Sequence, residues 1–240
     1  MKFAVIAAGE GSRLASEGVG VPKPLAEVKG EKLIDRLIRI FMDNDAEEIV
    51  VICNDKTNQV SQHLFQIEED GLKGRPVSLQ FKVKSTPSSM HSFFELSHML
   101  NDGPFVLTTV DTVFREAEFA SYVARFGEAL AQGADGLMGV TSFVDDEAPL
   151  WVGTREDMTI TGFYDRNDAA CRYISAGIYG LTPKVFGTLT RCVEAGESRM
   201  RNFQRALLRD GLRLKAWPFS KVIDIDHLAD MAKAEAFLSE

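Results

Sequence analysis

A glycine-containing loop followed by an arginine lies close to the start of the chain. Residues 7–14 read Ala-Ala-Gly-Glu-Gly-Ser-Arg-Leu and follow a short apolar run. Gly9 and Gly11 let the backbone turn tightly and bring its N–H groups close to a ligand, and amides in such a loop suit phosphate oxygens. Arg13 adds charge and several donors for the same anion. The segment predicts a phosphate-binding loop, and an ordinary glycine turn with a surface arginine is the alternative.

Two common phosphate-binding motifs do not match this loop. A Walker A motif requires Gly-Lys-Ser/Thr after a four-residue spacer, and the chain has Ser-Arg-Leu at residues 12–14. The dinucleotide-binding fingerprint requires a third glycine where this chain has Leu14. The loop is therefore of a different type from both.

A lysine between two prolines follows the loop. Residues 21–25 read Val-Pro-Lys-Pro-Leu, so Pro22 and Pro24 hold Lys23 in a stiff, extended segment. A lysine that is fixed in this way is better explained as a cation directed at one anion than as a solvated surface charge.

The two segments together resemble the start of the nucleotidyltransferases that make nucleotide-sugars and related activated compounds, the NDP-sugar pyrophosphorylases. The signature of that family is a glycine-rich loop ending in Arg-Leu, followed by Pro-Lys-Pro-Leu, as in residues 7–14 and 22–25 here. The resemblance implies a Rossmann-like three-layer α/β/α fold with a mainly parallel mixed sheet. It also implies that a nucleoside triphosphate and a phosphomonoester give a nucleoside-diphosphate-linked product and pyrophosphate.

The resemblance assigns roles to the residues of the loop and its surroundings. Arg13 and Lys23 are expected to act on the triphosphate, Arg13 at the departing pyrophosphate and Lys23 at the α-phosphate. Ser88 and Ser89 stand where the family often has Gly-Thr near the base, although both also suit a helix N-cap. The expected nucleotide-binding residues are Ala8, Gly9, Gly11, Ser12, Arg13, Lys23, Ser88 and Ser89.

The family also binds magnesium through carboxylates, and the chain offers three of them. Asp111 follows the apolar run 105–110, where an α/β sheet places its ligands, and capping of the next turn is its alternative role. Asp224 and Asp226 alternate on an extended segment, so their side chains point the same way. The resemblance implies Mg²⁺ as cofactor, held by Asp111, Asp224 and Asp226, without deciding which of the last two is the direct ligand.

The acceptor-binding segment departs from the family pattern. Residues 173–179 resemble the strand usually written Asn-x-Gly-Ile-Tyr, with Ser175 in place of Asn and with Gly177 retained. The family's Glu-Lys-Pro is missing, Arg166 lies in the comparable place, and Arg199 and Arg201 are the other candidates to replace its lysine. Arg166, Ser175 and Gly177 are the expected acceptor-binding residues.

These departures leave three functions open. A sugar 1-phosphate is the expected acceptor. The alternative is a cytidylyltransferase that uses phosphocholine or another phosphorylated alcohol. The acceptor half of the chain contains aromatic residues, and aromatic faces attract quaternary ammonium ions. Their alternative role is to pack in the core. A non-catalytic nucleotide-binding regulatory protein of the same fold is the third. The aromatic residues in question are Trp151, Tyr164, Tyr173 and Trp217.

The segments that must position these residues alternate between strands and helices. Continuous apolar runs predict strands at 3–8, 49–53, 78–83, 105–110, 136–143 and 174–181. Helical periodicity predicts helices at 32–44, 57–68, 89–100, 117–132, 199–210 and 228–238. The alternation favours a mainly parallel sheet, with a partly antiparallel segment after residue 137. We expect one domain, with a nucleotide-binding part at 1–136, an acceptor-binding part at 137–221 and a metal-ligand strand end with its C-terminal helix at 222–240.

Length, charge and cysteine content exclude several other classes. The chain has 240 residues and a net charge of −8, which weighs against nucleic acid as a partner. No apolar stretch approaches the length of about 18 residues that spans a membrane, so a cytoplasmic protein is expected. Cys53, Cys171 and Cys192 lack metal-site spacing and are expected to be reduced thiols. Neither the base of the nucleotide nor the oligomeric state follows from the sequence.

Overall fold

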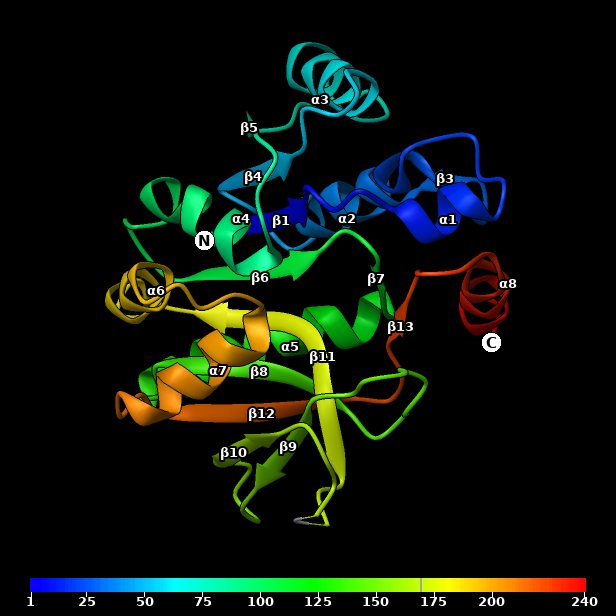
Figure 1. Ribbon diagram of the computed structural model, residues 1–240. Helices are drawn as coiled ribbons and strands as arrows, with labels where there is room; N and C mark the ends of the chain where they lie inside the picture. Colours follow the sequence, from blue (N-terminus) through cyan, green and yellow to red (C-terminus); the bar gives the residue numbers. More distant parts are fainter. Residues whose placement is uncertain (169) are drawn as a thin grey trace.

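The first four predicted strands form the parallel half of a nine-stranded sheet in the computed structural model, which describes residues 1–168 and 170–240. The order β5-β4-β1-β6 is parallel throughout (Figure 1). These strands are β1 (Lys2–Ala7), β4 (Glu48–Cys53), β5 (Leu79–Val83) and β6 (Phe105–Thr109). Their carboxyl ends meet at one edge, where α/β sheets bind ligands.

The second half of the sheet is mixed, as the sequence predicts for the segment after residue 137. The long strand β11 (Tyr173–Leu181) runs antiparallel to β6, β8 (Gly136–Thr141) and β9 (Trp151–Thr154). The strand β10 (Ile160–Tyr164) pairs with β9, and β12 (Leu214–Phe219) pairs in parallel with β8. The sequence did not predict β12 because Lys215 and Pro218 interrupt its apolar pattern, which an edge strand tolerates.

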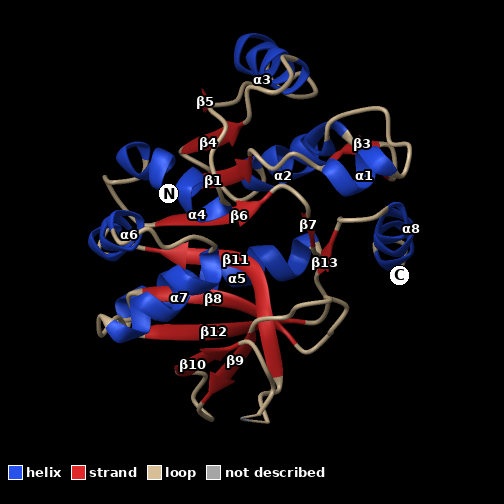
Figure 2. Cartoon of the chain, in the orientation of Figure 1, coloured by secondary structure: helices blue, strands red, loops and turns tan. Residues whose placement is uncertain are grey.

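Helices cover both faces of the sheet (Figure 2), which confirms the three-layer α/β/α prediction. One face packs against α2 (Leu33–Met42), α3 (Gln59–Asp70) and α5 (Glu116–Ala131). The other packs against α4 (Ser89–Leu96), α6 (Val185–Glu194) and α7 (Met200–Arg209). Alternate residues of β1 enter the two cores, Phe3 and Val5 on one side and Ala4 and Ile6 on the other. The predicted helices are found with slightly different ends, whereas α6 was not predicted.

Short elements join these layers at the ligand edge. They are α1 (Ser12–Ser16), the 3₁₀ turn Lys23–Leu25, the pairs β2 (Glu27–Val28) with β3 (Glu31–Lys32) and β7 (Thr112–Val113) with β13 (Ile223–Asp224), and α8 (Leu228–Phe237). A second 3₁₀ turn, Ser97–Met99, lies at the opposite edge, where Lys2 at the start of β1 donates to the Met99 carbonyl at 2.9 Å. Figure 1 shows α1, β7, β13 and α8 at the same end of the molecule. None of the helices formed by residues 1–168 and 170–240 is long and apolar enough to cross a membrane. The three cysteines are free thiols.

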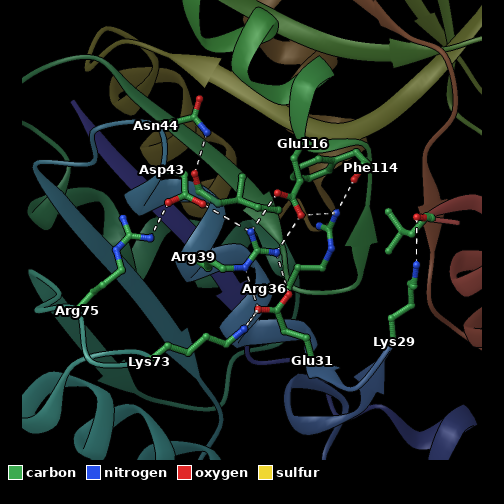
Figure 3. A network of polar contacts seen from close by, with 12 residues as sticks. Lys29, Glu31, Arg36, Arg39, Asp43, Asn44, Lys73, Arg75, Phe114 and Glu116 are labelled. Atoms are coloured by element: carbon green, nitrogen blue, oxygen red, sulfur yellow. Dashed lines mark hydrogen bonds and ion pairs between the residues drawn. The ribbon is translucent and has the colours of Figure 1, made fainter. Parts of the chain in front are cut away.

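A network of ion pairs connects α2 with β3 and α5 (Figure 3). Arg39 donates two hydrogen bonds to Glu31, at 2.9 and 2.8 Å, and two to Glu116, at 3.0 and 2.8 Å. Lys73 adds a contact of 2.7 Å to Glu31. Hydrogen bonds from Arg39 are the main reason why the pKa of Glu31 falls to about 2, and Lys73 contributes further.

Replacing Glu31 by glutamine is expected to lower the free energy of unfolding at pH 7 by about 1–3 kcal/mol, because charged hydrogen bonds are lost. The folded pKa of Glu31 lies below its ordinary value of 4.5, so its stabilisation is complete above that pH. The stabilisation disappears as the pH falls towards 2. Urea unfolding at several pH values should therefore show the difference between wild type and variant shrinking below pH 4.5. The exposed Glu47→Gln variant is the control, and an equal loss there would contradict the prediction.

Candidate active site

The glycine loop connects β1 to α1 at the carboxyl edge of the sheet. Gly11 has φ = 61°, a left-handed conformation, and precedes the first residue of α1 as its N-cap. A Cβ atom at Gly11 would lie 2.9 Å from the Cβ of Lys23, so the loop and the lysine segment are in close contact. The Asn54 amide donates to the carbonyls of Ala8 and Gly9, at 3.4 and 3.1 Å. The loop is thus held on both sides, and Ser12 is exposed at the start of α1.

Replacing Gly11 by alanine is expected to destabilise the protein by about 1–3 kcal/mol, because the change combines a strained φ with a steric clash. Gly9 offers a matched control two residues away, since a Cβ there meets no atom within 4 Å and its φ is not left-handed. Thermal unfolding without ligands should show a lowered Tm for Gly11→Ala and an unchanged Tm for Gly9→Ala. Equal Tm values for the two variants would contradict the description of this loop.

The Lys23 ammonium lies among carboxylates at the base of the loop. Pro22 has φ = −56° and ψ = 143°, which is the extended entry predicted from the flanking prolines. The Lys23 side chain is 10% exposed, and its Nζ lies 2.5 Å from Asp111 Oδ2 and 2.9 Å from Asp226 Oδ1. Burial works against the charged form, but the attraction of the two carboxylates outweighs it and raises the pKa of Lys23. Lys23 is therefore a fixed, permanently charged cation at neutral pH.

Arg13 reaches the same cluster from α1. Its Nη1 lies 2.9 Å from Asp226 Oδ2, so Asp226 accepts hydrogen bonds from both predicted phosphate-binding cations. The Arg13 side chain is 57% exposed and open to a ligand in front of the loop. The structure thus brings Arg13, Lys23, Asp111 and Asp226 together from three distant parts of the chain.

The third predicted carboxylate, Asp224, faces Asp111 across a small sheet. Thr112 in β7 pairs with Asp224 in β13, and the backbone N–H of Ile225 donates to the Asp111 carbonyl at 3.0 Å. The Asp224 side chain is exposed to water at this site. Partial desolvation by neighbouring protein atoms, together with the Asp111 and Asp226 charges, raises the pKa of Asp224 to about 8. When Asp224 is ionised, three carboxylates face the two cations Arg13 and Lys23, and a bound metal ion would relieve this excess of negative charge.

The donor set fits a magnesium ion that takes part of its coordination from substrate. Within residues 1–168 and 170–240, no group of three or more acidic, His or Cys side chains is arranged to hold a metal by itself. The three-carboxylate site expected from the sequence is therefore not preformed. Mg²⁺ usually binds through one or two carboxylates plus phosphate oxygens and water, and the facing carboxylates of Asp111 and Asp224 meet that requirement.

Two cavities meet at this cluster. The first has a volume of about 300 Å³ and the second about 320 Å³. The loop glycines Gly9 and Gly11, together with Lys23, Ser89 and Asp111, line the first, and Arg13 and Ser175 line the second. Asp224 and Asp226 line both cavities, in agreement with the prediction that they face the same way. The carboxylates thus stand between a loop-side cavity and a β11-side cavity.

The two cavities together form the cleft. Some of the remaining residues predicted from the sequence lie at this cleft, and others lie elsewhere in the molecule. Ser175 Oγ donates to Gln204 Oε1 at 3.2 Å beside the β11-side cavity, and Gly177, with φ = 70°, lies against Thr112. Ser88 is the N-cap residue of α4, but its hydroxyl contacts His91 Nδ1 at 2.9 Å and makes no cap bond. Arg166 lies elsewhere, in a pocket with Tyr164 and Arg205 that shares no lining residue with the cleft.

The structure adds cleft residues that the sequence did not predict. The segment 145–147, Asp-Asp-Glu, forms one wall of the β11-side cavity, and Lys233 from α8 contacts Asp145 at 2.7 Å and Asp230 at 3.2 Å. The acidic run is visible in the sequence, but its position opposite α8 is not. The cavity is lined by two permanently charged cations, Arg13 and Lys233, and by six carboxylates. The carboxylates are those of Asp145, Asp146, Glu147, Asp224, Asp226 and Asp230.

The aromatic residues considered for a quaternary ammonium ion do not line this cavity. Trp217 packs against Tyr122 and Phe219, and Tyr173 belongs to the core, as their alternative role requires. The aromatic ring that does line the cavity is Phe143, and the Lys221 ammonium lies 4.5 Å from its centroid.

Comparisons with known proteins agree with this geometry. Residues 3–157 match the MobA-like NTP transferase domain. The whole chain is 24% identical to a UTP–glucose-1-phosphate uridylyltransferase of Haloferax volcanii, of which the match covers 97%. Two solved structures share the fold at 20% identity. One is assigned as a glucose-1-phosphate thymidylyltransferase from Bacillus anthracis (TM-score 0.84, 100% of this chain and 96% of that one). The other is the inositol-1-phosphate CTP transferase from T. maritima (TM-score 0.78, 99% and 94%).

The family model covers well over half of the chain and includes the glycine loop, Lys23 and Asp111. Its match agrees with the fold and with the residues gathered at the carboxyl edge of the sheet. The chain belongs to the MobA-like NTP transferase domain family and is a nucleotidyltransferase.

Proposed function

We propose that this protein transfers a nucleotidyl group from a nucleoside triphosphate to a sugar 1-phosphate, with Mg²⁺ as cofactor, releasing pyrophosphate. The observation that carries the proposal is the junction of two cavities at Asp224 and Asp226, one beside the glycine loop and one beside β11. A triphosphate in the first and an acceptor phosphate in the second would meet at the carboxylates. The proposal divides one domain into a nucleotide-binding part, residues 1–136, an acceptor-binding part, residues 137–221, and a metal-ligand strand end with its C-terminal helix, residues 222–240.

Arg13, Lys23 and the loop amides act on the triphosphate in this proposal. The amides of the Gly9–Gly11 segment and the exposed Arg13 bind the β- and γ-phosphates, where negative charge grows as pyrophosphate leaves. Lys23 is buried and permanently charged, so it stabilises charge at the α-phosphate. Arg13 and Lys23 would exchange Asp226 for phosphate oxygens when the nucleotide binds. Ser89 lines the same cavity and lies near the base.

Asp111 and Asp224 hold the metal in this proposal, and Asp226 holds the two cations. Asp226 bonds to both Arg13 and Lys23. Of these two cations, Asp111 bonds to Lys23 alone, and Asp224 faces other carboxylates. When bound, Mg²⁺ neutralises the repulsion between the triphosphate and the incoming phosphate. The acceptor phosphate is itself a charged nucleophile near neutral pH, so this chain need not supply a general base.

A second candidate acceptor is a phosphorylated alcohol other than a sugar phosphate. The β11-side cavity has six acidic side chains, and Arg166 lies outside it, so its charge favours an acceptor whose phosphate is accompanied by a positive group, as in phosphocholine. One structure with the same fold is an inositol-1-phosphate CTP transferase. The Haloferax volcanii relative, a glucose-1-phosphate uridylyltransferase, favours the sugar phosphate.

Release of pyrophosphate tests both candidates directly. We would cross CTP, UTP, GTP and dTTP with a panel of sugar 1-phosphates, inositol 1-phosphate and phosphocholine, with Mg²⁺ present and with EDTA as control. Release that requires Mg²⁺ and one sugar 1-phosphate would support the proposal. Release with phosphocholine or inositol 1-phosphate alone would favour the second candidate. Silence with every pair, while a triphosphate still raises the Tm, would contradict both and favour the non-catalytic alternative.

A further inference from the structure

The segment that carries Asp111 has few connections to the main sheet. After β6 ends at Thr109, the chain makes a turn and forms β7, which is two residues long. Among the strands that the structure describes, β7 pairs only with the equally short β13. The turn is held by the Val110 N–H, which donates to the Ile6 carbonyl at 3.0 Å, and by the contact of 2.7 Å between the Thr109 and Thr112 hydroxyls. A strand pair of this length cannot fix its own position, so other groups must anchor it.

Arg36 in α2 supplies such an anchor. Its side chain is only 4% exposed, and its Nη2 donates to the carbonyl of Phe114, the residue after β7, at 2.7 Å (Figure 3). Within residues 1–168 and 170–240 this is the only hydrogen bond from a side chain to the backbone of residues 110–115. The Glu116 carboxylate lies 3.7 Å from the guanidinium, and the Phe114 ring centroid lies 5.6 Å from it.

We propose that Arg36 is a positioning residue for the metal-binding carboxylates. By binding the carbonyl of Phe114, it fixes the position of the β7–β13 pair and, through this pair, of both carboxylates. The proposal rests on the proposed metal ligands Asp111 and Asp224. Phe114 lies three residues after Asp111, and the pairing of Thr112 with Asp224 transmits its position to the second carboxylate. Arg36 itself touches neither ligand.

Burial of a guanidinium at this place is costly. One strong hydrogen bond, one longer ion pair and the cation–π contact with Phe114 compensate for only part of the loss of water around the charge, and this burial lowers the pKa of Arg36. An apolar side chain would pack beside Phe114, Phe119 and the rest of this core at less cost. What it could not do is bind the Phe114 carbonyl, which is the function that the proposal assigns to Arg36.

Arg39 provides the matched control, because it lies one turn further along α2 and belongs to the same network (Figure 3). It bonds to the Glu31 and Glu116 carboxylates and makes no hydrogen bond to the backbone of residues 110–115. We would compare Arg36→Met and Arg39→Met in the whole 240-residue chain. Mn²⁺ alone would serve as the probe, at concentrations high enough for the two carboxylates to bind it without substrate. Binding would be measured by electron paramagnetic resonance, and each Tm would be recorded in parallel.

Arg36→Met is expected to weaken Mn²⁺ binding about tenfold, which is the smallest loss of metal affinity typical of mutating groups that orient metal ligands. Arg39→Met should lower the Tm at least as much and leave Mn²⁺ affinity within about twofold of wild type, since its bonds do not reach the ligand segment. Unchanged affinity in Arg36→Met, or equal losses in both variants, would overturn the proposal in favour of a purely stabilising role.

If Arg36→Met does not fold, Arg36→Lys tests the same point, because it keeps the charge with a shorter reach. It is expected to weaken Mn²⁺ binding by about threefold, and wild-type affinity in this variant would overturn the proposal. Failure of the proposed function is a separate result, since it would appear as wild-type protein that binds Mn²⁺ and releases no pyrophosphate. The role of Arg36 in holding the carboxylates would stand in that case.

Discussion

Replacing Lys23 by methionine is expected to slow pyrophosphate release by about 10²–10³-fold, the loss typical of removing one preorganised donor from developing charge. The Lys23 ammonium is buried, fixed by its flanking prolines, and 2.5 Å from Asp111. Methionine keeps the unbranched shape of the side chain, so the packing of the loop is preserved. The expected loss lies mainly in kcat, because the charge at the α-phosphate is greatest in the transition state.

Lys184→Met is the control for the loss of a lysine charge. Lys184 is well exposed and pairs with Asp135, and neither residue lines the two cavities of the site. Its rate should equal that of wild type. A Lys23→Met protein that is folded, binds a triphosphate and turns over at the wild-type rate would contradict the assignment of Lys23 to the α-phosphate. A loss confined to KM would instead indicate that Lys23 binds the triphosphate equally in the ground and transition states.

The parts of the site that are encoded locally were predictable from the sequence. Gly11 must be glycine because of its left-handed φ and its contact with Lys23, and Lys23 is stiffened by its own neighbours. Asp111 follows an apolar strand whose direction in the sheet determines where its carboxylate lies. Each of these features depends on a few consecutive residues and on the rule that parallel strands end at one edge.

The acceptor side was predicted less well because its residues come together only through tertiary packing. Arg166 was assigned by its distance along the chain from the β11 motif, but the β9–β10 hairpin directs that segment to a separate pocket. Lys233 and Asp145 meet across 88 residues, and nothing in either local sequence indicates their contact. Arg36 is similar, since an arginine within the predicted helix 32–44 gives no sign in the sequence that it is buried against Phe114.

Replacing Asp224 by asparagine is expected to reduce turnover by at least about 10³-fold, because a direct metal ligand is lost, and yet to stabilise the metal-free protein at alkaline pH. The pKa of Asp224 in the folded protein is about 8, compared with an ordinary value of 3.8. Between these values the folded state keeps a proton that the unfolded state has lost, so wild type loses stability as the pH rises. Asparagine has no such proton to lose.

Thermal unfolding in EDTA between pH 5 and pH 9 measures this effect. The Asp224→Asn variant should become more stable than wild type towards pH 9, by roughly 1 kcal/mol after discounting for the water that reaches this side chain. Added Mg²⁺ should then raise the Tm of wild type and leave that of the variant unchanged, because only wild type keeps both ligands. Glu68→Gln, which removes an exposed charge from α3, should follow wild type at every pH. If Asp224→Asn followed it too, repulsion among Asp111, Asp224 and Asp226 would not be what prepares this cleft for a metal ion.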